Sequence, residues 1–218
     1  MNILIVSATE LEITPLLAQM KLDKTKSANL RSFSYKKMKI DVLVTGVGMT
    51  ATAFYLGKTL NKNYDAAINL GLAGSFNRNL NIGDVVNVQH DIFSELGAED
   101  GVKFLTLSDL KLSGVSEVMN ENKINNAVIE LIPKVTGITV NTVHGNEKSI
   151  TEVFERFHPY VESMEGAAFM MACSNEKIPY AQIRAISNYV ERRNKDAWNI
   201  PLAIDNLNKK AVEILESF

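Results

Sequence analysis

The chain has 218 residues, of which 46% are hydrophobic, and its formal net charge at pH 7 is −2. This length and composition suit a single domain, residues 1–218, with a sizeable core. The near-neutral charge and the lack of a basic stripe argue against nucleic-acid binding, and no apolar run is long enough to span a bilayer, so we expect neither kind of partner.

Short apolar runs alternate with helical patterns along the chain, which is typical of an α/β sheet with crossover helices. The predicted strands cover residues 2–7, 30–36, 39–45, 66–71, 85–90, 137–143 and 181–187. The predicted helices cover residues 10–20, 50–60, 122–132, 150–156, 164–176 and 201–216, and a short strand precedes the fifth of them. Between residues 90 and 122 the pattern is irregular, which predicts an excursion away from the sheet.

The chain contains one cysteine and three histidines, and neither set indicates chemistry of its own. Cys173 lies in an apolar helical segment, so we interpret it as a packing residue, and a lone cysteine fits a reducing compartment. His90, His144 and His158 are scattered without metal-ligand spacing, so we expect no metal and no cofactor. The first strand begins without a targeting signal, which favours a cytoplasmic protein.

Two acidic residues stand next to apolar segments. Glu165 lies at the start of the apolar helix predicted over residues 164–176. An ionised carboxylate is costly there unless a fixed partner or a ligand hydrogen-bonds it. Glu12 follows the apolar strand over residues 2–7, and its alternative interpretation is a solvated acid in the first turn of a helix, where the macrodipole favours it.

Ligands of open α/β sheets bind at the carboxyl ends of the strands. Four segments at such ends contain glycine or polar residues: 7–12, 45–49, 69–75 and 186–189. Residues 46–51 also satisfy the degenerate dinucleotide pattern G-x-G-x-x-A, but they follow a later strand and no acidic residue ends the next one. For any one segment, the alternative is that its glycines only turn corners.

Taken together, in order and approximate spacing, these segments resemble the nucleoside phosphorylase and nucleosidase group, which includes purine nucleoside phosphorylase and methylthioadenosine/S-adenosylhomocysteine nucleosidase. The resemblance covers nearly the whole chain, including residues 82–86, 162–168 and 184–188. Within the group, residues 162–168 and 187–193 with Trp198 are most similar to the futalosine hydrolases. The resemblance implies an α/β three-layer sandwich with a central twisted mixed sheet flanked by helices. It also implies a homo-oligomer, dimeric or larger, that acts on a small-molecule nucleoside.

The resemblance further implies roles in cleaving an N-glycosidic bond. Glu12 would be the base that orients the attacking water at the anomeric carbon. Glu165 would accept hydrogen bonds from the ribose hydroxyls, Met164 would pack against the sugar, and Asn188 would hold the purine. The other substrate-binding candidates are Gly74, Glu162 and Ser187.

Two departures from the relatives sharpen these expectations. Adenine-cleaving relatives carry aspartate where this chain has Asn188, and an asparagine can donate to the carbonyl oxygen of a 6-oxopurine and accept from a protonated N7. The alternative is an asparagine that caps a turn after the strand. The phosphorylases carry arginine and serine for phosphate where this chain has Asn69 and Leu72, so water is the expected nucleophile. Arg31 is either a surviving phosphate ligand or a surface residue.

Three functions stay open from the sequence. A futalosine hydrolase that releases hypoxanthine is favoured, and a nucleosidase for methylthioadenosine or S-adenosylhomocysteine is its rival. The third is a non-catalytic nucleotide-binding protein, against which the combination of Glu12, Glu165 and Asn188 argues. Binding of the aryl carboxylate of futalosine would be favoured by a cation and an apolar wall. The adjacent arginines at 192 and 193 are candidates for the cation, but they are in a loop, where arginines are more often solvated.

Overall fold

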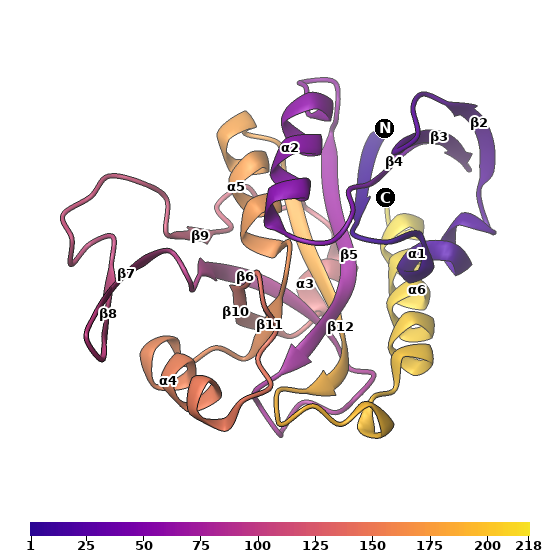
Figure 1. Ribbon diagram of the computed structural model, residues 1–218. Helices are drawn as coiled ribbons and strands as arrows, with labels where there is room; N and C mark the ends of the chain where they lie inside the picture. Colours follow the sequence, from indigo (N-terminus) through magenta and orange to yellow (C-terminus); the bar gives the residue numbers. More distant parts are fainter.

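The computed structural model describes residues 1–218, and its elements follow the predicted α/β alternation (Figure 1). The strands are β1 (Asn2–Ser7), β2 (Lys21–Thr25), β3 (Leu30–Tyr35), β4 (Met38–Val44), β5 (Ala66–Ser75), β6 (Val85–Phe93), β7 (Gly97–Asp100), β8 (Lys103–Thr106), β9 (Glu117–Met119), β10 (Lys134–Thr139), β11 (Val161–Ser163) and β12 (Tyr180–Tyr189). The helices are α1 (Glu10–Leu17), α2 (Met49–Thr59), α3 (Ala127–Leu131), α4 (Glu147–Phe157), α5 (Gly166–Glu176) and α6 (Ile200–Glu216), with a short 3-10 helix at Lys195–Ala197.

A single mixed sheet of ten strands forms the centre of the molecule. Its order is β11-β10-β6-β12-β5-β1-β4-β3-β2, and β9 pairs with β6. β1 is parallel to both β4 and β5, and β5 is parallel to β12. The carboxyl ends of these four strands therefore lie at the same edge of the sheet, where ligands are expected. β4, β3 and β2 form an antiparallel meander at the end of the strand order opposite to β11.

The sheet closes partly on itself at β11. This strand runs parallel to β10 and also pairs in antiparallel fashion with β5, where Val161 faces Ser75 and Glu162 faces Gly74. Strands β5, β12, β6, β10 and β11 thus form a closed ring. The expected central mixed sheet with helices is confirmed, and the ring is a feature that the sequence pattern did not predict. It places the segment around Glu162 against the end of β5.

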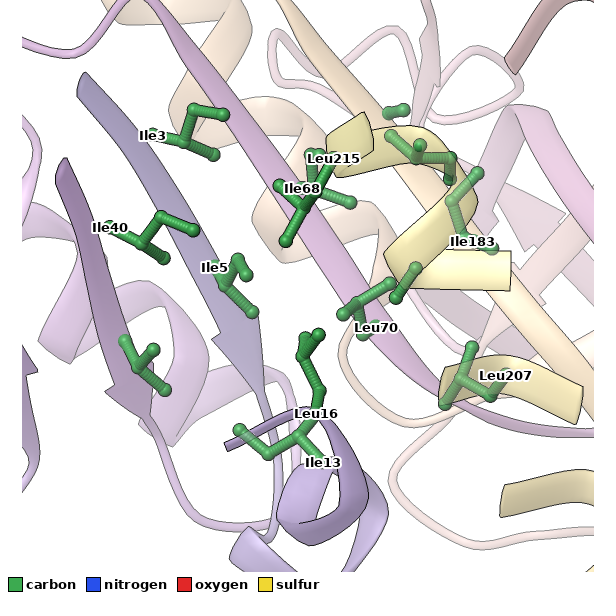
Figure 2. Close-up of a cluster of buried hydrophobic side chains, with 14 of the residues drawn as sticks. Ile3, Ile5, Ile13, Leu16, Ile40, Ile68, Leu70, Ile183, Leu207 and Leu215 are labelled. Carbon is green, nitrogen blue, oxygen red and sulfur yellow. The ribbon is translucent and has the colours of Figure 1, made fainter. Parts of the chain in front are cut away.

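Helices pack against both faces of the sheet. On one face, α1, α3 and α6 cover a large apolar cluster formed by β1, β4, β5 and β12. Figure 2 shows Ile13 and Leu16 from α1 and Leu207 and Leu215 from α6 beside the isoleucines of these strands. On the other face, α2 and α5 contribute side chains to a second cluster. Cys173 is fully buried there, which confirms it as a packing residue.

Most predicted elements are present, with shifted ends. The helix predicted over residues 122–132 is confined to α3, because Asn126 caps it by accepting hydrogen bonds from the backbone N–H groups of Val128 and Ile129. β5 and β12 extend beyond their predicted ends, and β2 was not predicted. The predicted excursion is confirmed: β7 and β8 form a hairpin that projects from the body of the molecule (Figure 1). No helix combines the length and apolarity needed to cross a membrane.

Candidate active site

The carboxylate of Glu12 is fixed on both of its oxygens. Its Oε2 accepts hydrogen bonds from the backbone N–H of Thr9 at 2.9 Å and from the Thr9 hydroxyl at 2.8 Å, which makes a capping box at the start of α1. Its Oε1 accepts from the backbone N–H of Leu72 on β5 at 3.1 Å. The alternative interpretation of Glu12 as a helix-start acid is therefore right in part, but the side chain is half-buried and turned toward the sheet.

Glu165 is the N-cap residue of α5, and the prediction that it lies within the helix's first turn is wrong by one position. Its side chain is buried, with Oε1 accepting from the backbone N–H of Gly48 at 2.9 Å, and Gly48 is itself the N-cap of α2. Burial raises the pKa of Glu165, the guanidinium of Arg184 opposes this rise, and the charge of Glu12 adds to it. The two carboxylates therefore share one electrostatic environment.

Arg184 is a component of the site that sequence reasoning missed. It is buried on β12, and its Nη2 lies 3.9 Å from Oε2 of Glu165. Its Nη2 also donates to Oδ1 of Asn69, and its Nε donates to Oε1 of Gln182 at 3.1 Å. The sequence did contain one indication of this role. Arg184 is a charged residue in a largely apolar strand and follows Gln182 by two positions, which places both side chains on the same face of the sheet.

The guanidinium of Arg184 occupies space that the absence of a side chain at Gly71 leaves open. A methyl group added at Gly71 would lie 2.0 Å from Nη1 of Arg184 and 3.2 Å from Oε1 of Glu12. No real carbon atom tolerates the first distance, so the guanidinium fits only beside a glycine. Gly71 therefore serves close approach and does more than turn a corner.

Behind Arg184 lies a buried polar network that also was not predicted. Asp91 accepts hydrogen bonds from Nε2 of Gln182 and from the hydroxyl of Thr139, both at 2.9 Å. The Thr139 hydroxyl oxygen accepts in turn from the backbone N–H of Ala167 at 2.7 Å. Burial raises the pKa of Asp91 to about 6. A methyl group at Gly166 would lie 2.2 Å from Oδ2 of Asp91, so α5 begins directly on this network.

Asn188 is oriented by a β-bulge and two hydrogen bonds. The register between β12 and β5 shifts between Ile186 and Asn188, leaving Ser187 as the extra residue. The Ser187 hydroxyl donates to Oδ1 of Asn188 at 2.8 Å, and Nδ2 of Asn188 donates to the carbonyl oxygen of Tyr189 at 3.0 Å. Because a carbonyl can only accept, the amide of Asn188 is held in one of its two orientations.

Asn188 and Glu162 face a small cavity of about 80 Å³, which Gly74, Arg193 and Trp198 also line. A methyl group at Gly74 would lie 3.2 Å from Nδ2 of Asn188 and 3.5 Å from Cγ of Glu162, so the two side chains are neighbours. The Arg193 guanidinium lies 5.1 Å from the centre of the Trp198 ring. The cavity thus combines amide, carboxylate and aromatic groups.

Three residues considered in the sequence analysis lie outside both the group around Glu12 and Glu165 and the group around Asn188 and Glu162. Met164 is half-buried and packs against an apolar cluster that includes Ile138 and Val140. The Leu72 side chain packs against the large core, so only its backbone reaches the site. Arg31 makes an ion pair with the exposed Glu10 at 3.0 Å, which supports the surface interpretation of this arginine.

The arrangement of the site and the match to a family model together lead to a class of protein. The half-buried carboxylate of Glu12 and the buried carboxylate of Glu165 lie with the buried guanidinium of Arg184, and farther along β5 and β12 is a cavity lined with amide and carboxylate groups. The model of the phosphorylase superfamily matches residues 2–218. The chain therefore belongs to the phosphorylase superfamily, and the resemblance inferred from its motifs is confirmed.

Individual relatives fall into two kinds. The chain is 32% identical over 194 residues to a futalosine hydrolase of Acidothermus cellulolyticus, covering 83% of this chain and 75% of the relative. It is 30% identical over 206 residues to a 5′-methylthioadenosine/S-adenosylhomocysteine nucleosidase of Bacillus subtilis, covering 86% of both. Its fold matches the structure of a futalosine hydrolase of Helicobacter pylori with a TM-score of 0.85, 16% identity and coverage of 100% and 98%.

These relatives confirm the enzyme class that was expected, namely hydrolases of N-glycosyl bonds. They do not separate futalosine hydrolase from the adenine-releasing nucleosidases, since both kinds match at similar identity. The predicted homo-oligomer, the cytoplasmic location and the roles of the individual site residues stay predictions.

Proposed function

We propose that this protein hydrolyses the N-glycosidic bond of futalosine and releases hypoxanthine and dehypoxanthine futalosine, a step of menaquinone biosynthesis. The single observation that carries this choice is the fixed amide of Asn188 at the cavity, in place of an acidic side chain. A nucleosidase for methylthioadenosine or S-adenosylhomocysteine is the alternative. In either case the sheet would be the middle of the three-layer sandwich expected for the family.

Hydrolysis requires stabilisation of the positive charge that develops on the sugar. In our proposal, Glu12 orients a water molecule whose oxygen attacks the anomeric carbon, and it takes the water proton as the bond to the purine breaks. The bonding electrons leave with the base, which takes up a proton from solvent at N7, so that neutral hypoxanthine is released. Glu165 accepts hydrogen bonds from the ribose hydroxyls, with Met164 against the sugar, and its negative charge favours the transition state over the ground state.

The position of Arg184 supports water rather than phosphate as the nucleophile. The phosphorylases use an exposed cationic group to bind phosphate, and Arg184 places a guanidinium in this region despite the asparagine at position 69. However, it is 1% exposed, its Nε and Nη2 donate to Gln182 and Asn69, and Nη2 also lies 3.9 Å from the carboxylate of Glu165. In our proposal its burial beside a negative carboxylate disfavours phosphate, which binds arginine through two parallel hydrogen bonds from an accessible guanidinium.

The orientation of Asn188 supports a 6-oxopurine leaving group. Its Nδ2 has a second hydrogen beyond the one donated to Tyr189, and its Oδ1 has a second lone pair beyond the one that accepts from Ser187. The amide can therefore donate to O6 of hypoxanthine and accept from a protonated N7. Gly74 permits the close approach of Asn188.

The surroundings of the cavity suit the distal part of futalosine. That substrate carries an aryl carboxylate tethered through the ribose 5′ position, which is favoured by a cation beside an apolar wall. Arg193, which is exposed, and Trp198 provide such a pair, and in our proposal they contact the aryl carboxylate outside the cavity rather than within it. Methylthioadenosine does not require such a pair, because its 5′ substituent is uncharged.

A phosphate-free assay of the purified protein with futalosine, inosine and methylthioadenosine tests the proposal, with the released base identified by chromatography. We expect hypoxanthine from futalosine and little base from the other two substrates. Adenine from methylthioadenosine at a comparable rate would favour the alternative function. Activity that appears only after phosphate is added would show that the argument from Arg184 is wrong.

A further inference from the structure

The helix that begins at Glu165 receives its cap from a different part of the chain. An N-cap side chain ordinarily accepts a hydrogen bond from the second or third backbone N–H of its helix. Glu165 is the N-cap residue of α5, yet its side chain makes no such bond. The backbone N–H of Ala167 instead donates to the hydroxyl oxygen of Thr139 at 2.7 Å. Thr139, the last residue of β10, therefore caps α5 in place of Glu165.

This arrangement leaves the carboxylate of Glu165 free to face away from its own helix. Its Oε1 accepts from the backbone N–H of Gly48, and its Oε2 lies 3.9 Å from Nη2 of Arg184. Ala167 is fully buried, so its N–H needs an acceptor within the protein. Without the hydroxyl of Thr139, the acceptor closest in sequence is the side chain of Glu165. A carboxylate that turned toward the start of α5 would leave both of its present partners.

Asp91 fixes the direction of the Thr139 hydroxyl. A hydroxyl has one hydrogen, and Thr139 donates it to Oδ1 of Asp91 at 2.9 Å, so its lone pairs are left for Ala167. Both side chains are buried, with Thr139 0% and Asp91 1% exposed. Thr139 also lies opposite Ser163 at the end of β11, which leads directly into the segment that contains Glu165. The cap is thus held by strand pairing and by a buried carboxylate.

The other oxygen of Asp91 leads to Arg184. Oδ2 of Asp91 accepts from Nε2 of Gln182 at 2.9 Å, and Oε1 of Gln182 accepts from Nε of Arg184 at 3.1 Å. Because a guanidinium only donates and an ionised carboxylate only accepts, the amide of Gln182 has a single orientation. A methyl group at Gly166 would lie 2.1 Å from Oε1 of Gln182, so α5 begins directly on this path. The two oxygens of Asp91 therefore serve one path to Arg184 and one to the helix that carries Glu165.

We propose that Asp91 is a positioning residue for hydrolysis. Through Thr139 it keeps the carboxylate of Glu165 turned away from α5 and available to the ribose hydroxyls. Through Gln182 it holds the guanidinium of Arg184 beside the same carboxylate. The inference rests on the proposed function, since it takes Glu165 to bind the sugar. None of the residues in either path lines the purine cavity, so the choice of base is independent of it.

The direct test is Thr139→Val, which keeps the shape of the side chain and removes the hydroxyl. The assay is run at about pH 8, above the pKa of about 6 to which burial raises Asp91. We expect kcat to fall about 10- to 100-fold, because the carboxylate of Glu165 turns back to cap α5. Binding of hypoxanthine, measured by calorimetry, should stay within about twofold, because the purine cavity is a separate site.

Two further variants control for the loss of the hydroxyl. Thr139→Ser keeps this group and should recover most of the turnover. Thr136→Val makes the same change as the test variant on a half-buried residue of the same strand, outside the network, and should leave kcat unchanged. Equal losses of kcat and of hypoxanthine binding in Thr139→Val would indicate general damage and would contradict the inference.

A double variant separates positioning from an independent effect on the fold. Because Thr139 acts through Glu165 in our inference, Thr139→Val should lower the residual kcat of Glu165→Gln by no more than about twofold. The same large loss in both backgrounds would contradict the inference. Should Thr139→Val fail to fold, Asp91→Asn decides by the same comparison, since an asparagine has one acceptor oxygen and cannot accept along both paths.

The choice of substrates distinguishes failure of this inference from failure of the proposed function. Turnover is followed with futalosine and with methylthioadenosine in phosphate-free buffer. Release of base from neither by the wild type would overturn the proposed function and this inference with it. Release by the wild type with an unchanged kcat in Thr139→Val would overturn the inference alone. If methylthioadenosine is the substrate cleaved, the choice of futalosine is wrong, and the same variants decide the role of Asp91 on that substrate.

Discussion

The proposed site has two parts, the ribose side with Glu12 and Glu165 and the purine cavity with Asn188 and Glu162, and they are held in place in different ways. On the ribose side, the carboxylates of Glu12 and Glu165 accept hydrogen bonds from backbone N–H groups of Leu72 and Gly48, so the fold itself fixes them. In the purine cavity, Asn188 and Glu162 depend on the side chains of Ser187 and His144 as well as on the nearby backbone of Tyr189 and His144. The carboxylates proposed to carry out the hydrolysis are thus anchored to backbone groups distant in sequence. The groups proposed to select the base also depend on side chains that single substitutions can change.

The largest effect is expected for Glu12→Gln. The amide keeps the size of the side chain but cannot take a proton from water, so kcat should fall by about 10²–10⁴-fold. Binding of hypoxanthine should stay within about twofold, since the purine cavity is untouched. The matched control is Glu10→Gln, an exposed acid two residues earlier. Equal losses of turnover and base binding would mean that Glu12 is not the base.

Gly71→Ala tests the buried guanidinium behind the ribose side. The added methyl group would displace Arg184 and separate it from Glu165, and breaking a buried ion pair costs about 3–5 kcal/mol of unfolding free energy. Gly57→Ala is the control, because its methyl group meets open space within α2 and should stabilise the helix by up to about 1 kcal/mol. Urea denaturation of both variants measures the difference, and similar midpoints would contradict the tight fit.

Asp91 should make stability depend on pH. Burial raises the pKa of Asp91 to about 6 from its ordinary 3.8, so the folded state holds a proton between these values that the unfolded state has lost. The associated stability is complete below about pH 4 and is lost as the pH rises through about 6, a change of up to about 3 kcal/mol.

Asp91→Asn provides the reference for this measurement, because the other carboxyl groups titrate alike in both proteins. The unfolding free energy of the wild type relative to the variant should fall between pH 4 and pH 7. Parallel urea-denaturation curves across this range would show that Asp91 titrates normally.

The smallest effect is expected in the purine cavity with Asn188→Asp. An acidic side chain cannot donate to O6 when ionised, so the ratio of kcat/KM for 6-oxopurine over 6-aminopurine nucleosides should fall about tenfold. Asn79→Asp, an exposed substitution on another loop, is the control. An unchanged ratio would remove Asn188 from the selectivity argument.

The ribose side of the site was largely predictable from the sequence, because its residues follow short apolar runs that read clearly as strands. Glu12 after β1 and Glu165 before α5 are local features of this kind. Arg184 and Asp91 were missed because each strand contains several polar residues with nothing local to single them out, and their link through Gln182 depends on pairing between strands far apart in sequence. Periodicity carries no information about that pairing.

The purine cavity was predicted as a set of residues without its geometry. The bulge at Ser187 and the pairing of β11 with β5 depend on register, which is set by tertiary packing. The bond between Glu162 and His144 joins residues 18 positions apart through a loop. At the start of α3 the cap itself is local, but Asn126 is also held by a long-range hydrogen bond from its Nδ2 to the carbonyl oxygen of Ile214, which the sequence pattern did not indicate.

The closure of the strands into a ring also decides where the sheet is vulnerable. A strand paired on both sides offers no backbone groups to a foreign chain, and ring closure gives β11 a partner on each side. Apart from the short β9, the edge left open is β2, where all five residues are exposed and three, Lys21, Asp23 and Lys24, are charged. Charged side chains on an edge strand oppose edge-to-edge aggregation, so the molecule protects the one long edge that its topology cannot close.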